Sequence, residues 1–275
     1  MAAPIQRRAL WAEGLLLLVI ATFCIFPFYW MVTTSLKTQV VALESPPVWS
    51  FTPTLANYWE VLFEDKVGVS LINSIIVAVC TTTLAVVLGT PAAYALARFE
   101  FRGKQDLWFW FITNRFVSPV VLAFPVFLIS REVGLRDTHL ALILMYLTFT
   151  LPIVIWICTD QFRSIPRELD EAALLEGASQ WRIFRSICLP LAMPGVAVSS
   201  ILSFIFSWNE LLFAYILAPK AAKTAPAMAI TFMEGYDVPY GKIMATSTLI
   251  VIPVLIFALI ASKHLVRGLT MGAVK

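Results

Sequence analysis

The stretch Glu171-Ala172-Ala173-Leu174-Leu175-Glu176-Gly177-Ala178 is a polar island between long apolar segments, and the chain is organised around it. Residues that favour helices run into it from Arg167 and end at Gly177, which adopts a left-handed conformation without a side-chain clash. The small side chains of the two alanines leave room for close approach by a partner. The stretch therefore predicts a short helix that ends in a tight turn.

A second short helix is expected directly after this turn. The hydroxyl of Ser179 can cap exposed backbone donors at its start, and the helix would then run through Trp181 and Phe184. Pro190 lacks a backbone N–H group and is expected to break it. Helix, turn and helix together predict a rigid docking loop over about residues 160–193.

The composition indicates a membrane protein. Hydrophobic residues make up 60% of the chain and charged residues only 13%, whereas soluble domains are about 45–50% apolar. The net charge of +3 is small, so it gives no support for nucleic-acid binding. We therefore predict an integral membrane protein that is surrounded by lipid and has no nucleic-acid partner.

Six apolar segments are long enough to cross a bilayer. A hydrocarbon core of about 30 Å needs about 20 mostly apolar residues in a spanning helix, and continuously apolar segments exclude the alternating strands of a barrel. We predict an all-α, polytopic membrane protein in which residues 1–275 form a single transmembrane domain. The six predicted spans are residues 10–32, 69–91, 107–129, 140–159, 194–218 and 243–262.

The distribution of lysine and arginine predicts the orientation, because these residues favour the cytoplasmic side. Placing both termini inside puts the basic residues of the docking loop and of the tail 263–275 in the cytoplasm. The opposite side carries fewer basic residues, diluted by acidic ones. The sequence thus predicts a multi-pass protein of a bacterial or archaeal (inner) membrane with both termini cytoplasmic.

The chain carries none of the usual catalytic or nucleotide-binding patterns. It has no G-x-x-x-x-G-K-[ST] loop, whose backbone and lysine bind nucleotide phosphates. Its two histidines and four cysteines lack the spacing of a metal site. We expect no enzymatic activity, no bound metal and no bound cofactor, so the energy for active transport would come from another chain or from an ion gradient.

The docking loop resembles the EAA motif of permeases in ATP-binding cassette (ABC) importers, with Glu176 where that family usually has Asp. Six further segments, in the expected order, resemble the carbohydrate-uptake branch and specifically the second permease subunit of maltose-type importers. The resemblance covers nearly the whole chain and implies a type I importer permease fold. The six segments are Asn73-Ser74, Pro91-Ala92-Ala93-Tyr94-Ala95-Leu96-Ala97-Arg98-Phe99, Phe101-Arg102-Gly103-Lys104, Gly134-Leu135-Arg136-Asp137, Trp208-Asn209-Glu210 and Gly268-Leu269-Thr270-Met271-Gly272-Ala273-Val274-Lys275.

The resemblance implies a transmembrane permease subunit that translocates a carbohydrate or polyol. Its expected partners are a second permease subunit, two cytoplasmic ABC ATPase subunits that bind ATP and Mg, and an extracytoplasmic solute-binding protein. Glu171 is the expected polar contact with the ATPase, and Gly177 sets the turn. The implied coupling residues are Glu171, Ala172, Ala173, Glu176, Gly177, Ala178, Phe184 and Pro190.

Two charged residues lie inside predicted spans, Arg115 in the third and Glu210 in the fifth. Charge in lipid costs at least a few kcal/mol, so such residues usually face the interior of the bundle. One hypothesis is that they line the translocation path. The alternative is a structural ion pair or separate tethers between helices, which the resemblance favours because it implies that much of the sugar site lies on the partner permease. The path candidates are Asn114, Arg115, Trp208, Asn209 and Glu210.

Other functions were weighed against the importer permease. A secondary transporter driven by an ion gradient tends to show internal repeats and ion-coordinating groups in broken spans, whereas this chain has few membrane-embedded acids. A membrane-embedded enzyme needs a cluster of a nucleophile, a base or a metal. The sequence leaves open which sugar or polyol is carried, and whether the second permease is a different chain or a second copy.

Overall fold

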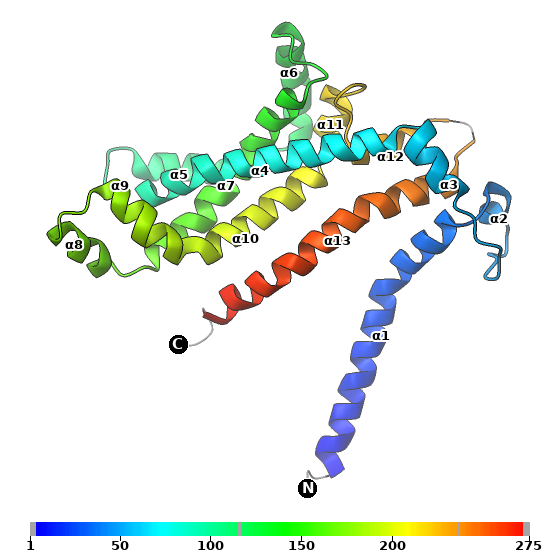
Figure 1. Cartoon of the computed structure of the whole chain (residues 1–275), viewed down its shortest axis with the longest axis horizontal. Coiled ribbons are helices and arrows are strands. Elements are labelled where there is room, and N and C mark those ends of the chain that lie inside the picture. Colours follow the sequence, from blue (N-terminus) through cyan, green and yellow to red (C-terminus); the bar gives the residue numbers. More distant parts are fainter. Residues whose placement is uncertain (1–3, 115–116, 236, 272–275) are drawn as a thin grey trace. The chain divides into compact units, whose positions relative to one another are not determined.

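The computed structural model describes the backbone of residues 4–114, 117–235 and 237–271, and the side chains of residues 13–258 apart from the same gaps (Figure 1). Every regular element in these ranges is helical, which confirms the all-α prediction. The helices are α1 (Pro4–Ser35), α2 (Gln39–Leu43), α3 (Ala56–Trp59), the π-helical turn η1 (Glu60–Glu64), α4 (Val67–Arg98), α5 (Lys104–Thr113), α6 (Pro119–Glu132), α7 (His139–Arg163), α8 (Glu168–Leu175), α9 (Gln180–Ile183), the π-helical turn η2 (Phe184–Cys188), α10 (Leu189–Trp208), α11 (Leu212–Leu217), α12 (Ala225–Thr231) and α13 (Tyr240–Met271).

Five helices within the described ranges are long and apolar enough to span a membrane. They are Glu13–Ser35, Val67–Arg98, His139–Arg163, Gln180–Trp208 and Tyr240–Ala258. The predicted third span, residues 107–129, instead falls on α5 and α6, which have 10 and 14 residues. Neither is long enough to cross alone, so the predicted count of six spans is not confirmed.

The predicted break at Pro190 is wrong, because the helix continues through it. Helices α9 and α10 are joined by the wide turn η2, in which the N–H of Leu189 bonds back five residues to the carbonyl of Phe184. Pro190 follows directly and lies in the first turn of α10, where a missing N–H is tolerated. Residues Gln180–Trp208 therefore form one continuous rod.

The predicted fifth span, residues 194–218, ends early. Helix α10 stops at Trp208, and Asn209 begins the break. The carboxylate of Glu210 accepts hydrogen bonds from the N–H groups of Phe213 at 3.1 Å and Ala214 at 3.2 Å. These are orphan donors at the start of α11, so a charged residue inside an apolar run starts a new helix instead of continuing the old one.

The chain divides into two compact units, one of residues 1–68 and 229–249 and one of residues 69–228 and 250–275. In the second unit, α7 and α10 lie side by side (Figure 1). Small residues allow this approach, because a Cβ on Gly195 of α10 would lie 2.9 Å from the side chain of Gln161 in α7. Gly89 allows α4 a similar approach to α7, since a Cβ there would lie 2.8 Å from the side chain of Val154. Close backbone approach at glycine is typical of packed membrane helices.

A loop at residues 218–224 of the second unit is held by polar side chains. Asn73 donates both amide hydrogens, at 3.0 Å each, to the carbonyls of Ala221 and Lys223. Its oxygen must then accept the 2.8 Å bond from Nε2 of His139, which assigns the proton to that nitrogen.

Two residues before His139, Asp137 accepts backbone N–H bonds from residues 220, 221 and 222.

Asp137→Asn is expected to destabilise the protein at neutral pH and much less in acid. Burial opposes the charge of Asp137, but the N–H groups of Ala221, Lys220 and Ala222 outweigh it and lower its pKa. A lowered pKa gives stabilisation that is complete above the unfolded value of about 3.9 and is lost as the pH falls through the folded value. The variant should lose about 1 kcal/mol at pH 7.

Thermal unfolding of the purified protein in detergent, followed from pH 7 down to pH 3, measures this difference. Asn keeps the left-handed backbone of position 137, where φ is +63°, so the comparison isolates the charge. A difference between wild type and Asp137→Asn that stays constant over this pH range would contradict the assignment.

Candidate functional site

Helices α8 and α9 form an elbow, residues 168–183, whose corner is set by Gly177. This residue has φ of +81°, a conformation that costs a residue with a side chain about 1–2 kcal/mol. The N–H of Gly177 bonds to the carbonyl of Leu174 and that of Ala178 to the carbonyl of Ala173, both at 3.0 Å. These bonds close the end of α8, so the predicted helix that ends at Gly177 is confirmed.

The second arm of the elbow begins as predicted at Ser179. Its hydroxyl accepts the N–H of Arg182 at 3.3 Å and caps α9. Because α9 continues through η2 into α10, this arm is the start of a spanning helix. The elbow is therefore joined to the membrane bundle by helix and not by a flexible linker.

A largely buried ion pair fixes the first arm to the bundle. Arg98, the last residue of α4, places Nε 2.8 Å from Oδ2 of Asp170 in α8, and the two side chains are only 5% and 15% exposed. Nη2 of the same arginine donates to the carbonyl of Ile165 at 3.0 Å. The thiol of Cys188 donates to the other oxygen of Asp170 at 3.1 Å. The carboxylate is thus held from α4 and from η2.

The inner side of the elbow is apolar and packed. Phe184 is 4% exposed, and its ring lies 5.1 Å from Tyr94 of α4 and 6.1 Å from Phe162 of α7, measured between centroids. Ala173 is 7% exposed and belongs to the same core cluster. This corrects the expectation that Ala173 leaves room for a partner, since the chain's own core fills that room. Phe184 likewise faces the bundle.

The outer side of the elbow is open and partly apolar. Leu175 is 91% exposed and Trp181 is 62% exposed. Neither was a predicted coupling residue, but four residues that were predicted, Glu171, Ala172, Glu176 and Gly177, are also exposed. Large apolar side chains on a charged surface indicate a protein contact, so the outer side of α8 and α9 is the candidate site.

The structure favours the structural alternative for Trp208 and Glu210. The indole of Trp208 is 1% exposed, and its Nε1 donates to the carbonyl of Ile250 in α13 at 3.2 Å. It is thus a tether between helices and its ring is not free to stack on a sugar. Glu210 uses its carboxylate to cap α11. Both contacts support the structural role that the sequence favoured over a place on the path.

The other path candidates are not brought together with these two. Asn209 is exposed and donates to the carbonyl of Ile205, one turn earlier in α10. Asn114 lies at the end of α5 and lines a shallow depression with Trp110, Thr113 and Val117. Arg115 lies outside the described residues. The four candidates that the structure describes therefore make separate contacts with the rest of the chain.

Sequence reasoning missed Arg98 and Asp170 as site residues. Arg98 stands at the end of the apolar run of α4, and Asp170 lies one residue before Glu171. An arginine at the end of an apolar run and an acid inside a short helix each have ordinary explanations alone. Only the fold shows that the two side chains meet.

Three comparisons extend this description. The family model described as "Binding-protein-dependent transport system inner membrane component" matches residues 85–271. The chain is 40% identical over 273 residues to the trehalose transport system permease protein SugB of Mycobacterium tuberculosis, with 98% of each chain covered. It is 34% identical over 280 residues to the trehalose/maltose transport system permease protein MalG of Thermococcus litoralis, covering 100% of this chain and 99% of the other.

A solved structure is similar in fold. It is a chain of a bacterial ABC transporter involved in the import of the acidic polysaccharide alginate, with a TM-score of 0.79 and 22% sequence identity. The match covers 96% of this chain and 98% of that one. The likeness in fold therefore extends over nearly the entire chain.

Asp170→Asn is expected to lower the stability of the protein by about 3 kcal/mol, because it leaves the buried charge of Arg98 without its counter-ion. Thermal unfolding in detergent measures the loss. The matched control is Asp160→Asn, whose partner Arg163 is 3.7 Å away with both side chains about half exposed; pairs of this kind contribute at most about 1 kcal/mol. Equal shifts in Tm for the two variants would refute a special role for the buried pair.

Proposed function

Since this chain belongs to the family of binding-protein-dependent transport system inner membrane components, we propose that it moves a carbohydrate across the membrane when ATPase subunits push on its elbow. The chain is the permease subunit of an ABC importer. The proposal adds the docking surface, the route of the force and the class of the solute.

The observation that carries the proposal is the contrast between the two sides of the elbow. The inner side is fixed by the ion pair between Arg98 and Asp170 and by the ring of Phe184. The outer side presents Leu175 and Trp181 in the open. The exposed apolar residues can bind the ATPase, and the packed inner side fixes the elbow to the bundle. A movement of the ATPase is then passed on to the bundle, because close packing leaves little room for side-chain motion to absorb it.

The force would pass along two routes. One runs from α8 through the ion pair to the end of α4, and the other runs from α9 directly into α10. Both helices belong to the unit that also contains α7. Closure of the ATPases on ATP and Mg would therefore move these helices together and open the translocation path to the outside. Hydrolysis of ATP would return the helices to their starting positions.

The remaining assembly follows from this reading. The elbow and both termini lie in the cytoplasm, where ATP is available, and two ATPase subunits hold the nucleotide and Mg. A second permease subunit, most simply a different chain, completes the translocation path, and a solute-binding protein delivers the substrate from outside. The distribution of basic residues supports this orientation.

The carried solute is proposed to be a glucose disaccharide of the trehalose or maltose kind. Support comes from the 40% identity to the trehalose permease SugB and the 34% identity to the trehalose/maltose permease MalG, each over nearly the full chain. Of the path candidates that the structure describes, Trp208 and Glu210 are engaged by the chain's own backbone, which is consistent with a sugar site that rests largely on the second permease.

Leu175→Glu is expected to weaken binding of the ATPase subunits about tenfold or more, because a hot-spot side chain contributes about 2 kcal/mol and the new charge must be desolvated. Co-purification of the ATPase with the permease from membranes measures the loss. Leu43→Glu, at a leucine that is 55% exposed in α2 outside the elbow, should leave the ATPase bound. Equal retention by both variants would contradict docking at the elbow.

The complex of the two permeases, the ATPases and the binding protein, reconstituted in vesicles, should accumulate trehalose or maltose when ATP is enclosed with the ATPases, and sorbitol much more slowly. Radiolabelled uptake measures this directly. An ionophore that collapses ion gradients should leave uptake intact. Uptake by this chain alone, or uptake that needs the ion gradient, would instead support the secondary transporter.

A further inference from the structure

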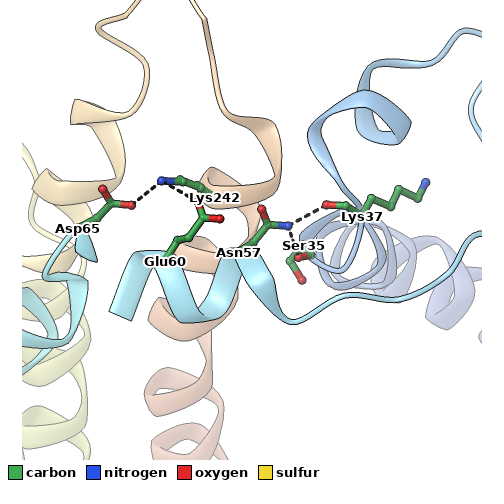
Figure 2. Close-up of polar contacts among 6 residues, drawn as sticks. All are labelled: Ser35, Lys37, Asn57, Glu60, Asp65 and Lys242. Atoms are coloured by element: carbon green, nitrogen blue, oxygen red, sulfur yellow. Dashed lines mark hydrogen bonds and ion pairs between the residues drawn. The ribbon is translucent and has the colours of Figure 1, made fainter. Parts of the chain in front are cut away.

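The first compact unit contains a short helix pinned to the end of a membrane span. This helix, formed by α3 and η1 over residues 56–64, directs the amide of Asn57 toward the carbonyls of Ser35 and Lys37, each 2.8 Å away (Figure 2). The hydroxyls of Tyr58 and Ser35 are 2.7 Å apart. Because the span of α1 ends at Ser35, these bonds place the helix at the depth where α1 leaves the membrane.

A second pin joins the same helix to the start of α13. Nζ of Lys242 lies 3.0 Å from a carboxylate oxygen of Glu60 and 3.0 Å from one of Asp65 (Figure 2). The neighbouring Gly241 packs so closely that a Cβ there would lie 2.6 Å from the amide of Asn57. The span of α13 begins at Tyr240, so the helix is fixed at the boundary of two spans of its own unit.

The buried side of the pinned helix carries Asn57 and Glu60 together with Val61, which is fully buried, and its exposed side is apolar apart from Glu64. Asn57 and Glu60 turn toward the protein, whereas Leu55, Trp59 and Phe63 are 70%, 63% and 64% exposed. The rings of Trp59 and Phe63, four residues apart on the helix, are tilted by 39° to each other with centroids 4.4 Å apart. We name Leu55, Trp59 and Phe63 the aromatic stripe. A helix at a water-facing surface shows the opposite arrangement.

We propose that the aromatic stripe binds lipid at the boundary between headgroups and acyl chains. Three observations support lipid as the partner. The two pins hold the helix at the depth where spans end, which is where tryptophan is enriched. Glu60 and Asp65 both pair with Lys242, which offsets one of their two negative charges. Apolar exposure also continues onto α1 in the same unit, where Tyr29 and Val32 are 50% and 40% exposed.

Energy favours the same partner. Removal of large apolar side chains from water is favourable, so the three side chains of the aromatic stripe stabilise the helix when they enter the interface. Amphipathic helices that lie in the plane of a membrane are held by this gain. The helix thus joins the end of α1 to the start of α13 and holds both at the surface of the membrane.

Nitroxide labelling of the complete reconstituted transporter tests the proposal. Trp59→Cys is made in a background with Cys24→Ala and Cys80→Ala, since the other two cysteines, Cys158 and Cys188, are buried. Collision of the label with oxygen, which concentrates in lipid, is compared with collision with a water-soluble nickel chelate. The label at position 59 should collide more with oxygen, and this preference should not change when the solute-binding protein is added.

The matched control is Glu64→Cys on the same helix, where the native side chain is exposed and charged; its label should prefer the nickel chelate. ATP-driven uptake shows that each variant is folded, and Phe63→Cys replaces Trp59→Cys if uptake is lost. A nickel preference at position 59 would show a water-facing stripe and overturn the proposal. Shielding from both reagents, or immobilisation by the binding protein, would show a protein contact and overturn it equally.

Discussion

The ion pair between Arg98 and Asp170 is the constraint on which the elbow depends. Both side chains are nearly buried, and a buried charge without its partner is far more costly than the pair. Few placements of α8 satisfy both charges together with the bonds from Arg98 to the carbonyl of Ile165 and from Cys188 to Asp170. Electrostatics therefore decides where the elbow sits, and the aromatic rings fill the space that this leaves.

The far end of the same unit is governed by a similar constraint. There the N–H and carbonyl groups of the loop at residues 218–224 need hydrogen-bond partners. Asn73 and Asp137 supply them. Between these two ends, close contacts at Gly89 and Gly195 bring α4, α7 and α10 together. Specific polar bonds at the ends and tight packing in the middle allow the unit to move as one body.

Local signals in the sequence predicted the local structure well. The left-handed turn at Gly177 and the cap at Ser179 both depend on neighbours in the chain, and both are present. Membership of the importer family was also recognisable, because its motifs are distributed over the whole sequence.

Predictions failed where a distant or unusual contact decides the outcome. Pro190 does not break its helix, since the preceding wide turn removes the need for its N–H group. The sequence left a path role and a structural role open for Glu210, because it could not show that the carboxylate accepts backbone N–H groups within one turn. The pair of Arg98 and Asp170 left no pattern, because residues that meet only through the fold have no fixed spacing.

The continuity of residues Gln180–Trp208 has a geometric consequence. At 1.5 Å per residue, these 29 residues form a rod about 40 Å long. A tilt of about 5° about one end of such a rod sweeps the other end through about 4 Å, roughly the width of a methylene chain. A slight rotation imposed at Ser179 thus becomes a displacement of several ångströms near Trp208. The length of the rod alone produces this amplification.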